Sequence, residues 1–166
     1  FVAMVTWGGW SFAAPPESLK TTTATWDWAR DLRADVGSRN PLPDGYGFGN
    51  VWHLLRTTRS QGPTATRTWQ RDGRYAMLKL RGDRLFSAPI SAWAFRLKPS
   101  ALAPFAGRYT SAQNIGVSFK AGDVVIAPGP DHAIVVGWRS PVTGPVKIEG
   151  YVKDVHPTCG NGVSWR

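Results

Sequence analysis

The sequence lacks several features that would assign it to a familiar class of protein. A single cysteine, Cys159, excludes a disulfide within the chain. With only two glutamates, Glu17 and Glu149, a glycosidase-like carboxylate pair would have to use a loop aspartate. No apolar run reaches the roughly 18 residues of a membrane helix, so we expect no membrane span. The chain also has no phosphate loop, dinucleotide fingerprint or Gly-x-Ser-x-Gly motif, and we expect no enzymatic activity.

What the chain does contain is typical of a folded β protein. At 166 residues it is long enough to bury a core without metal or disulfide support. The 42% hydrophobic content excludes a disordered chain. The 18 glycines and 13 prolines favour many short strands joined by tight turns. Nine tryptophans are many for a chain of this length. We expect some of them in the core and others on flat apolar surfaces of the kind on which sugars stack.

The clearest strand pattern lies near the C-terminus. From 146 to 153, apolar or small residues alternate with Lys147, Glu149, Tyr151 and Lys153, which predicts a half-buried strand. The run 132–138 does not alternate and predicts a strand buried on both faces. Pro/Gly turns separate these strands, so we predict an antiparallel β-sandwich or barrel. Its predicted core includes Val135, Trp138, Val146, Ile148 and Val152.

Along the whole chain we predict roughly eight strands and at most one or two short helices. Residues 1–24 are expected to form a strand or extended arm with a linker, and residues 25–166 the sandwich domain. Residues 25–36 are ambiguous, because Trp28, Leu32 and Val36 have helical spacing while Trp26 and Trp28 alternate with Asp27. Since the chain ends in an apparent strand at Trp165, we expect the sandwich to be truncated there and the chain to be part of something longer.

The formal net charge of +9 points to an acidic partner or to a solvated basic surface. Seven arginines fall between Arg56 and Arg84, which leaves an anionic polysaccharide open as a ligand. These arginines are scattered rather than packed into one short block. We therefore favour a solvated face and do not expect nucleic acid as the partner.

Several motifs together resemble a known module. In the first half these are Asn40-Pro41, Asp44-Gly45-Tyr46-Gly47 and Val51-Trp52-His53. In the second half they are Val136–Pro141, Val146–Gly150, Asp154–Pro157, Cys159–Val163 and Trp165. This pattern, over residues 28–166, resembles a β-sandwich module of large exported bacterial proteins. Some of those proteins carry a cytochrome-c-like domain, and others carry a cell-envelope sorting signal.

The resemblance implies a jelly-roll-like, all-β fold in an extracytoplasmic protein (periplasmic, cell-surface or secreted). It also implies carbohydrate binding without catalytic residues, and a strand in place of the helix at 28–36. On this basis we expect a non-enzymatic module that recognises a glycan or another cell-envelope polymer. Two alternatives stay open: an interaction domain that docks on other domains of its parent protein, and, more remotely, a fragment of a hydrolase.

Aromatic residues in or beside loops are the candidate ligand-binding groups. An indole or phenol ring stacks on a pyranose ring, and nearby Arg, Asn or Asp bind its hydroxyls. The alternative for Trp52 and Trp93 is a place in the core. The candidates are Trp52, Trp69, Trp93 and Tyr46, with Arg71 as the polar partner.

Metal and thiol sites are weaker hypotheses. Asp154 and His156 are candidate zinc ligands near Cys159, although their spacing matches no common zinc pattern. No cofactor is expected, but loop aspartates leave a structural calcium open. His132 resembles the histidine of a cysteine peptidase, yet no cysteine precedes it, so we predict that Cys159 is not a nucleophile. The loop aspartates considered for calcium are Asp44, Asp72, Asp123 and Asp131.

Overall fold

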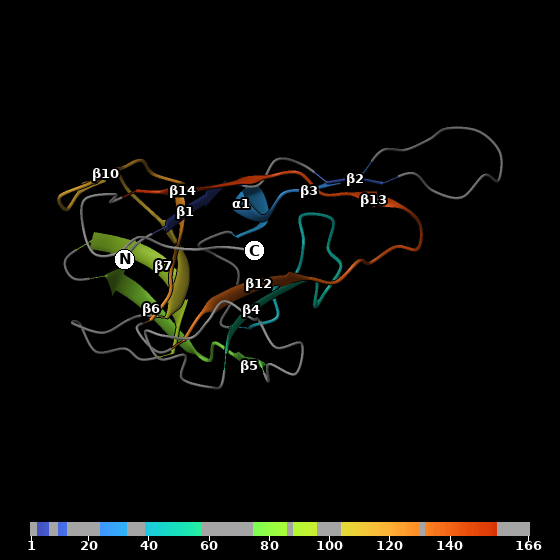
Figure 1. Cartoon of the computed structure of the whole chain (residues 1–166), viewed down its shortest axis with the longest axis horizontal. Helices are drawn as coiled ribbons and strands as arrows, with labels where there is room; N and C mark the ends of the chain where they lie inside the picture. Colours follow the sequence, from blue (N-terminus) through green and yellow to red (C-terminus); the bar gives the residue numbers. More distant parts are fainter. Residues whose placement is uncertain are drawn as a thin grey trace, which may run out of the picture.

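The computed structural model describes residues 3–6, 10–12, 24–32, 39–57, 75–85, 88–95, 104–129 and 132–155. These ranges contain fourteen short strands and one four-residue helix, and every strand pair is antiparallel. The predicted all-β antiparallel sandwich is confirmed (Figure 1). The strand count exceeds the predicted eight because six of the strands have only two or three residues.

Fourteen strands and one helix follow one another along the described parts of the chain. The elements are β1 (Ala3–Thr6), β2 (Trp10–Phe12), β3 (Thr25–Trp26), α1 (Trp28–Asp31), β4 (Trp52–Thr57), β5 (Tyr75–Met77), β6 (Leu80–Leu85), β7 (Ala88–Ala94), β8 (Phe105–Tyr109), β9 (Gln113–Asn114), β10 (Ser118–Phe119), β11 (Val124–Ala127), β12 (Ile134–Trp138), β13 (Val146–Lys147) and β14 (Tyr151–Asp154).

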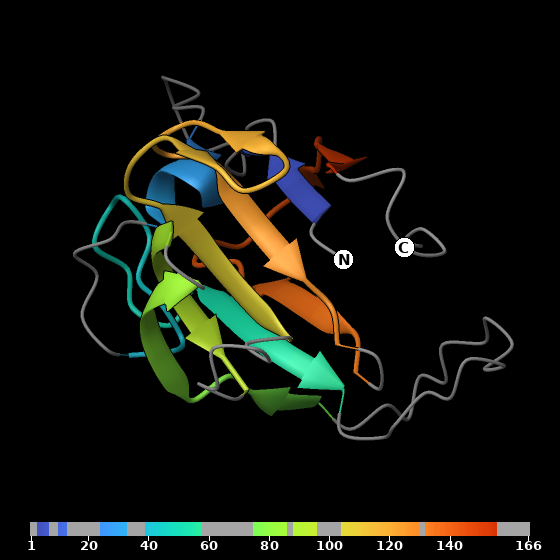
Figure 2. The same cartoon turned by 90° about the vertical axis from the view of Figure 1, so that its left-hand side faces the viewer.

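A six-stranded sheet in the order β14-β1-β11-β8-β7-β6 forms one layer of the sandwich. The predicted N-terminal strand lies inside this sheet, since β1 pairs with β11 on one side and β14 on the other. Figure 2 shows β8 and β11 side by side, in register from Phe105 opposite Ala127 to Arg108 opposite Val124.

Two three-stranded sheets, β12-β4-β5 and β13-β2-β3, and the β9–β10 hairpin complete the described fold. In Figure 1, β13 and β2 run along the upper side, β12 and β4 along the lower side, and α1 lies between them. Within the described residues, no helix is long and apolar enough to cross a membrane.

The main core lies where α1 and β3 meet the inner faces of β4, β7, β8 and β11. Four tryptophans in it are at most 1% exposed, and each such ring buries roughly 150–250 Å² of surface. This cluster comprises Trp26, Trp28, Leu32, Leu42, Val51, Trp52, Leu54, Leu78, Trp93, Ala106 and Val124.

A second core covers the opposite face of β7, β8 and β11. The β9–β10 hairpin supplies Phe119, and Ile115 and Val117 pack against the same cluster. These three strands are therefore buried on both faces. They carry small residues where neighbouring strands approach each other closely. A Cβ atom on Gly107 would lie 2.6 Å from the Cβ of Ala92. The cluster comprises Ala88, Ile90, Ala92, Ala94, Phe105, Tyr109, Phe119, Val125 and Ala127.

The ambiguous segment at residues 25–36 divides into a strand and a helix. Thr25–Trp26 is β3, and Trp28–Asp31 is α1. The helical spacing therefore predicted α1 correctly. The strand that the family resemblance implied is wrong for Trp28–Asp31. The helix begins there because the Asp27 carboxylate accepts hydrogen bonds from the amides of Ala29 and Arg30, at 2.9 and 3.3 Å. Residues 33–38 lie outside the described residues.

The predicted C-terminal core is only partly correct. Trp138 and Val152 pack against the main core as partly buried side chains. Val146 and Ile148 do not, because they are 40% and 58% exposed. The prediction that 132–138 is buried on both faces is also wrong, since every described side chain of β12 is only partly buried. Among the described residues, these segments supply β12, β13 and β14, each of which is the outermost strand of its sheet.

Candidate functional site

The candidate site is the loop from Asp44 to Asn50, which lies between the two residues of the isolated bridge, Leu42 and Trp52. Its sequence, Asp-Gly-Tyr-Gly-Phe-Gly-Asn, alternates glycine with aromatic residues. Gly47 has φ 92°, a conformation that side-chain-bearing residues rarely adopt. The backbone of Asp44 closes the loop, donating to the Phe48 carbonyl at 3.0 Å and accepting from Gly47 at 3.4 Å.

The Asp44 carboxylate organises the inside of this loop. Its Oδ1 accepts hydrogen bonds from the amides of Tyr46 and Phe48, at 2.9 and 2.8 Å. Its Oδ2 accepts from the indole N–H of buried Trp26, at 2.5 Å. Both oxygens are thus engaged by N–H donors and Asp44 is 8% exposed. Its role is that of a turn aspartate that anchors the loop to the core.

A second buried carboxylate, Asp31, lies beneath the loop. It accepts from the Trp52 indole N–H and from Arg30 Nε, both at 3.0 Å, and it is 2% exposed. Gly45 passes so close that a Cβ atom there would lie 2.9 Å from Asp31 Oδ1. Burial lowers the pKa of Arg30, but the hydrogen bond and charge of Asp31 outweigh it and raise that pKa above its ordinary value.

Tyr46 and Phe48 present the outer surface of the loop. They are 52% and 48% exposed. The Tyr46 ring is tilted against Trp26, with centroids 5.3 Å apart, and the Arg30 guanidinium lies 5.6 Å from its centroid. The backbone amide of Phe48 donates a hydrogen bond to the Asp44 carboxylate, which holds this residue in place. The loop therefore carries two half-exposed aromatic rings, and a guanidinium lies beside one of them, at Tyr46.

Asn50 ends this loop, and His53 follows it on β4. Asn50 is exposed and has φ 57°, and its carbonyl lies 3.1 Å from Nε2 of His53. Asn50 is thus a polar residue of the loop that carries Tyr46 and Phe48.

Of the residues predicted from sequence to bind ligand, Tyr46 lies on this surface. Trp52 and Trp93 are each 1% exposed, so they fill the core and offer no ring face to a ligand, as their alternative interpretation held. Trp69 and Arg71 lie outside the described residues. Phe48 and Arg30 were not predicted as ligand-binding residues. The alternation of glycine with aromatic residues at 45–49 could have indicated that Phe48 is exposed.

The proposed metal ligands are not brought together in the described part of the chain. Asp154 is partly buried, while His156 and Cys159 fall outside that part. No group of three or more His, Cys, Asp or Glu side chains able to hold a metal occurs among the described residues. Asp123 is a turn aspartate that accepts from the Lys120 amide at 2.7 Å. Asp72 and Asp131 are likewise outside the described residues.

Comparisons with protein-family models, with curated proteins and with solved structures found no match to this chain.

Proposed function

We propose that this chain is a non-enzymatic binding module that recognises carbohydrate through the Asp44–Asn50 loop. The observation that carries the proposal is the pair of half-exposed rings, Tyr46 and Phe48, on a loop whose shape is held by one buried carboxylate. A contact surface that is ordered before binding loses little conformational entropy when a ligand arrives. Aromatic side chains fix such a surface with few rotatable bonds.

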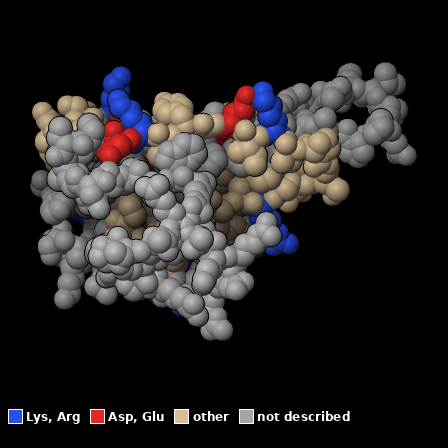
Figure 3. Space-filling view, in the orientation of Figure 1, with Lys and Arg blue, Asp and Glu red and all other residues tan. Residues whose placement is uncertain are grey.

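A neutral sugar suits this surface better than a strongly anionic polymer. The guanidinium beside Tyr46 already pairs with buried Asp31, so its charge is balanced locally. In the view of Figure 3, blue cationic and red acidic side chains of the described residues lie beside one another along the upper edge, and further blue side chains lie on the lower right. Stacking and neutral hydrogen bonds are little affected by salt, whereas contacts with an anionic polymer weaken steeply as salt rises.

The wider setting of the module is proposed on the resemblance of its sequence motifs. An exported bacterial parent protein, in the periplasm or at the cell surface, would expose the loop to envelope glycans. Trp69 and Arg71 remain ligand-binding candidates from the sequence alone. An interaction domain is the second candidate function, and the exposed apolar side chains of 142–151 favour it.

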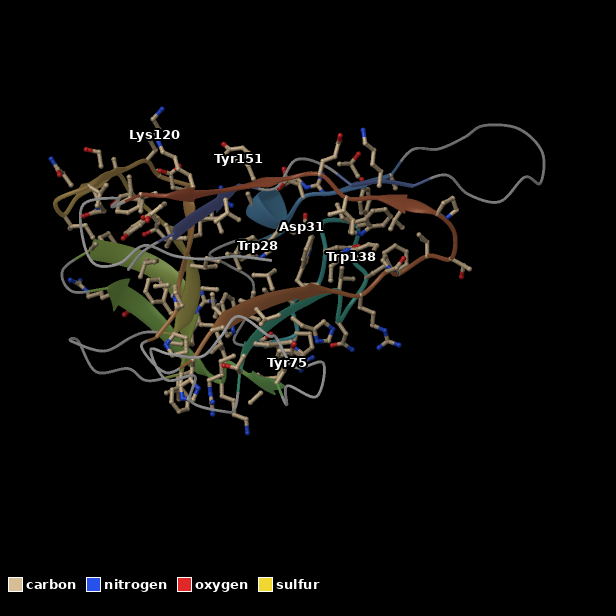
Figure 4. All side chains as sticks on the ribbon, in the orientation of Figure 1. Trp28, Asp31, Tyr75, Lys120, Trp138 and Tyr151 are labelled. Carbon is tan, nitrogen blue, oxygen red and sulfur yellow. The ribbon has the colours of Figure 1, made fainter. Side chains whose placement is uncertain are left out.

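The experiment is binding of a neutral and an anionic polysaccharide at low and physiological salt. We expect Tyr46→Ala and Phe48→Ala each to weaken binding of the neutral polymer about 3- to 10-fold, the effect of losing one aromatic contact. Tyr75→Ala is the matched control, since Tyr75 is equally exposed (47%) but lies on β5, on the lower side of the molecule in Figure 4. Normally folded loop variants that bind like the wild type would exclude this site.

A further inference from the structure

Two basic side chains near the end of β4 have buried nitrogen atoms without a hydrogen-bond partner among the described residues. These atoms are Nε of Arg56 and Nδ1 of His132. Almost every buried polar atom of a native protein has a partner, so an exception requires a physical explanation. One such explanation is that the atom serves to bind an ion or a ligand.

The pairing of β4 with β12 brings these two side chains to the same face. Arg56 lies directly opposite Ile134, and Figure 1 shows the two strands side by side. The pairing continues past the start of β12, because the Thr57 amide donates to the Ala133 carbonyl at 3.1 Å. The Ala133 amide in turn donates to Thr57 Oγ1, also at 3.1 Å. His132 precedes Ile134 by two residues, so it lies on the face of Arg56 as its diagonal neighbour.

The ring of Phe95, which directly follows β7, lies against both side chains. The guanidinium carbon of Arg56 is 3.8 Å from the ring centroid, and the imidazole centroid of His132 is 5.4 Å from it. Arg56 Nη1 donates to the Thr57 carbonyl at 2.9 Å. The Nε and Nη2 atoms of Arg56, which form one side of the guanidinium, remain for another acceptor.

No carboxylate among the described residues balances the charge of Arg56. The ion pairs within that part of the chain join other residues. The face of Phe95 attracts the cation, but it does not replace a hydrogen-bond acceptor for Nε. Burying an N–H of a charged group without an acceptor is costly. An anion at this position would therefore stabilise the fold.

We propose that Arg56 and His132 bind a carboxylate group at this end of the sandwich. The Nε and Nη2 of Arg56 form the two-donor fork that matches both oxygens of a carboxylate. The Nδ1–H of His132 is the third donor, and a carboxylate has enough lone pairs for all three. One carboxylate balances the charge of Arg56, whereas a phosphate dianion would exceed it. Both side chains are only partly buried, so a ligand reaches them from the surface.

This site is separate from the Asp44–Asn50 loop and does not rest on the function proposed for it. The loop leads into β4 at Trp52, whereas Arg56 lies at the other end of that strand. A substitution in the loop should therefore leave carboxylate binding unchanged.

The test is thermal unfolding of the full 166-residue chain in sodium acetate and in sodium chloride of the same ionic strength. Acetate at about ten times its dissociation constant should raise the melting temperature by about 3–6 °C relative to chloride. In amide NMR spectra, acetate should shift the signals of Thr57 and Ala133 most. Glucuronate is the second probe, and tighter binding of glucuronate than of acetate would assign the carboxylate to an acidic sugar.

Arg56→Met removes the donors but keeps an unbranched side chain on Phe95, and it should lose the acetate-dependent shift. Arg84→Met is the matched control, because Arg84 is exposed on β6 and its loss changes the net charge equally. It should keep the full shift, as should Tyr46→Ala in the loop. His132→Phe retains a ring against Phe95 and should weaken acetate binding about 3- to 10-fold, the effect of losing one hydrogen bond.

Three results would count against the site. Acetate that stabilises no more than chloride would overturn the proposal, as would an Arg56→Met variant that keeps the shift. If Arg56→Met does not fold, Arg56→Lys keeps the charge without the fork. Equal acetate affinity of Arg56→Lys and wild type would then overturn the two-donor contact. A larger shift with inorganic phosphate than with acetate would overturn the assignment to a carboxylate.

Discussion

The hydroxyl of Tyr46 forms two hydrogen bonds with the backbone of Thr25, accepting from its amide at 3.2 Å and donating to its carbonyl at 3.0 Å. One side chain thus takes the place of a neighbouring strand at the edge of β3. The same bonds hold the ring in position for contact with a ligand. A single hydroxyl therefore links the stability of the sheet edge to the geometry of the candidate site.

Removing that hydroxyl should lower stability without removing the ring. We expect Tyr46→Phe to reduce the free energy of unfolding by about 1 kcal/mol, the net value of a typical exposed or half-exposed hydrogen bond. Urea denaturation measures the difference. Tyr75→Phe, at a similarly exposed tyrosine, should leave the midpoint unchanged. Equal effects of the two substitutions would mean that the Thr25 contacts contribute nothing.

Loss of the Asp44 carboxylate should cost more. Asp44→Ala removes the acceptor of the Trp26 indole N–H and of two loop amides, so we expect a loss of about 2–4 kcal/mol. Asp44→Asn keeps one carbonyl oxygen and should cost roughly half as much. Thermal or urea unfolding gives both values, and tryptophan fluorescence reports the surroundings of Trp26. A neutral Asp44→Ala would show that the loop is held by other contacts.

A methyl group on Gly45 should disturb buried Asp31, which pairs with Arg30 beneath the loop. Its Cβ would lie 2.9 Å from Asp31 Oδ1, and we expect Gly45→Ala to destabilise the fold by about 1–3 kcal/mol. Gly49→Ala is the matched control, because no atom lies within 4 Å of a Cβ there. It should change stability by less than about 0.5 kcal/mol. The prediction is wrong if the two alanine variants unfold at the same denaturant concentration.

Alkaline pH should destabilise the protein through Tyr109. Burial raises the pKa of this phenol from its ordinary value of 10 to about 12. The neutral form is thus favoured in the fold, so its stabilisation is complete below pH 10 and is lost as the pH rises towards 12. Tyr109→Phe cannot ionise and should lack this loss.

The measurement is the difference in unfolding free energy between wild type and Tyr109→Phe from pH 8 to pH 12. The hydroxyl is buried without a hydrogen-bond partner among the described residues, so phenylalanine should be tolerated at neutral pH. The ring contact with Phe119, at 4.4 Å between centroids, remains in the variant. Parallel pH curves for the two proteins would contradict the prediction.

The fold class was predictable from sequence because alternation and turn residues report strands directly. Alternation at 146–153 predicted one strand, whereas the structure has two short strands there, β13 and β14, with residues 148–150 between them outside any strand. Alternation also does not reveal which strands are outermost. Val146 and Ile148 were assigned to the core for that reason, yet they are exposed on an edge. The helix at Trp28–Asp31 was one of two interpretations, and the capping contacts of Asp27 decide it.

The site was harder to predict, because large aromatic residues serve both cores and binding surfaces. Trp52 and Trp93 have sequence surroundings similar to those of a surface tryptophan, and only the packing of α1 against β4 and β7 shows that they are buried. Tyr46 and Phe48 differ because glycines flank both, so no neighbouring side chains can cover them. The flanking glycines can be read from the sequence, so the exposure of these two rings is predictable. The burial of Trp52 and Trp93 depends on elements that are distant in the sequence and is not.

The close packing of β7, β8 and β11 also determines the order in which the fold opens. These strands are covered on both faces and approach each other at Ala92 and Gly107. They are also near one another in sequence, with only the β9–β10 hairpin between β8 and β11, so their contacts form with little loop-closure entropy. Amide hydrogens there should exchange most slowly, and those of the outer β13–β14 edge most rapidly.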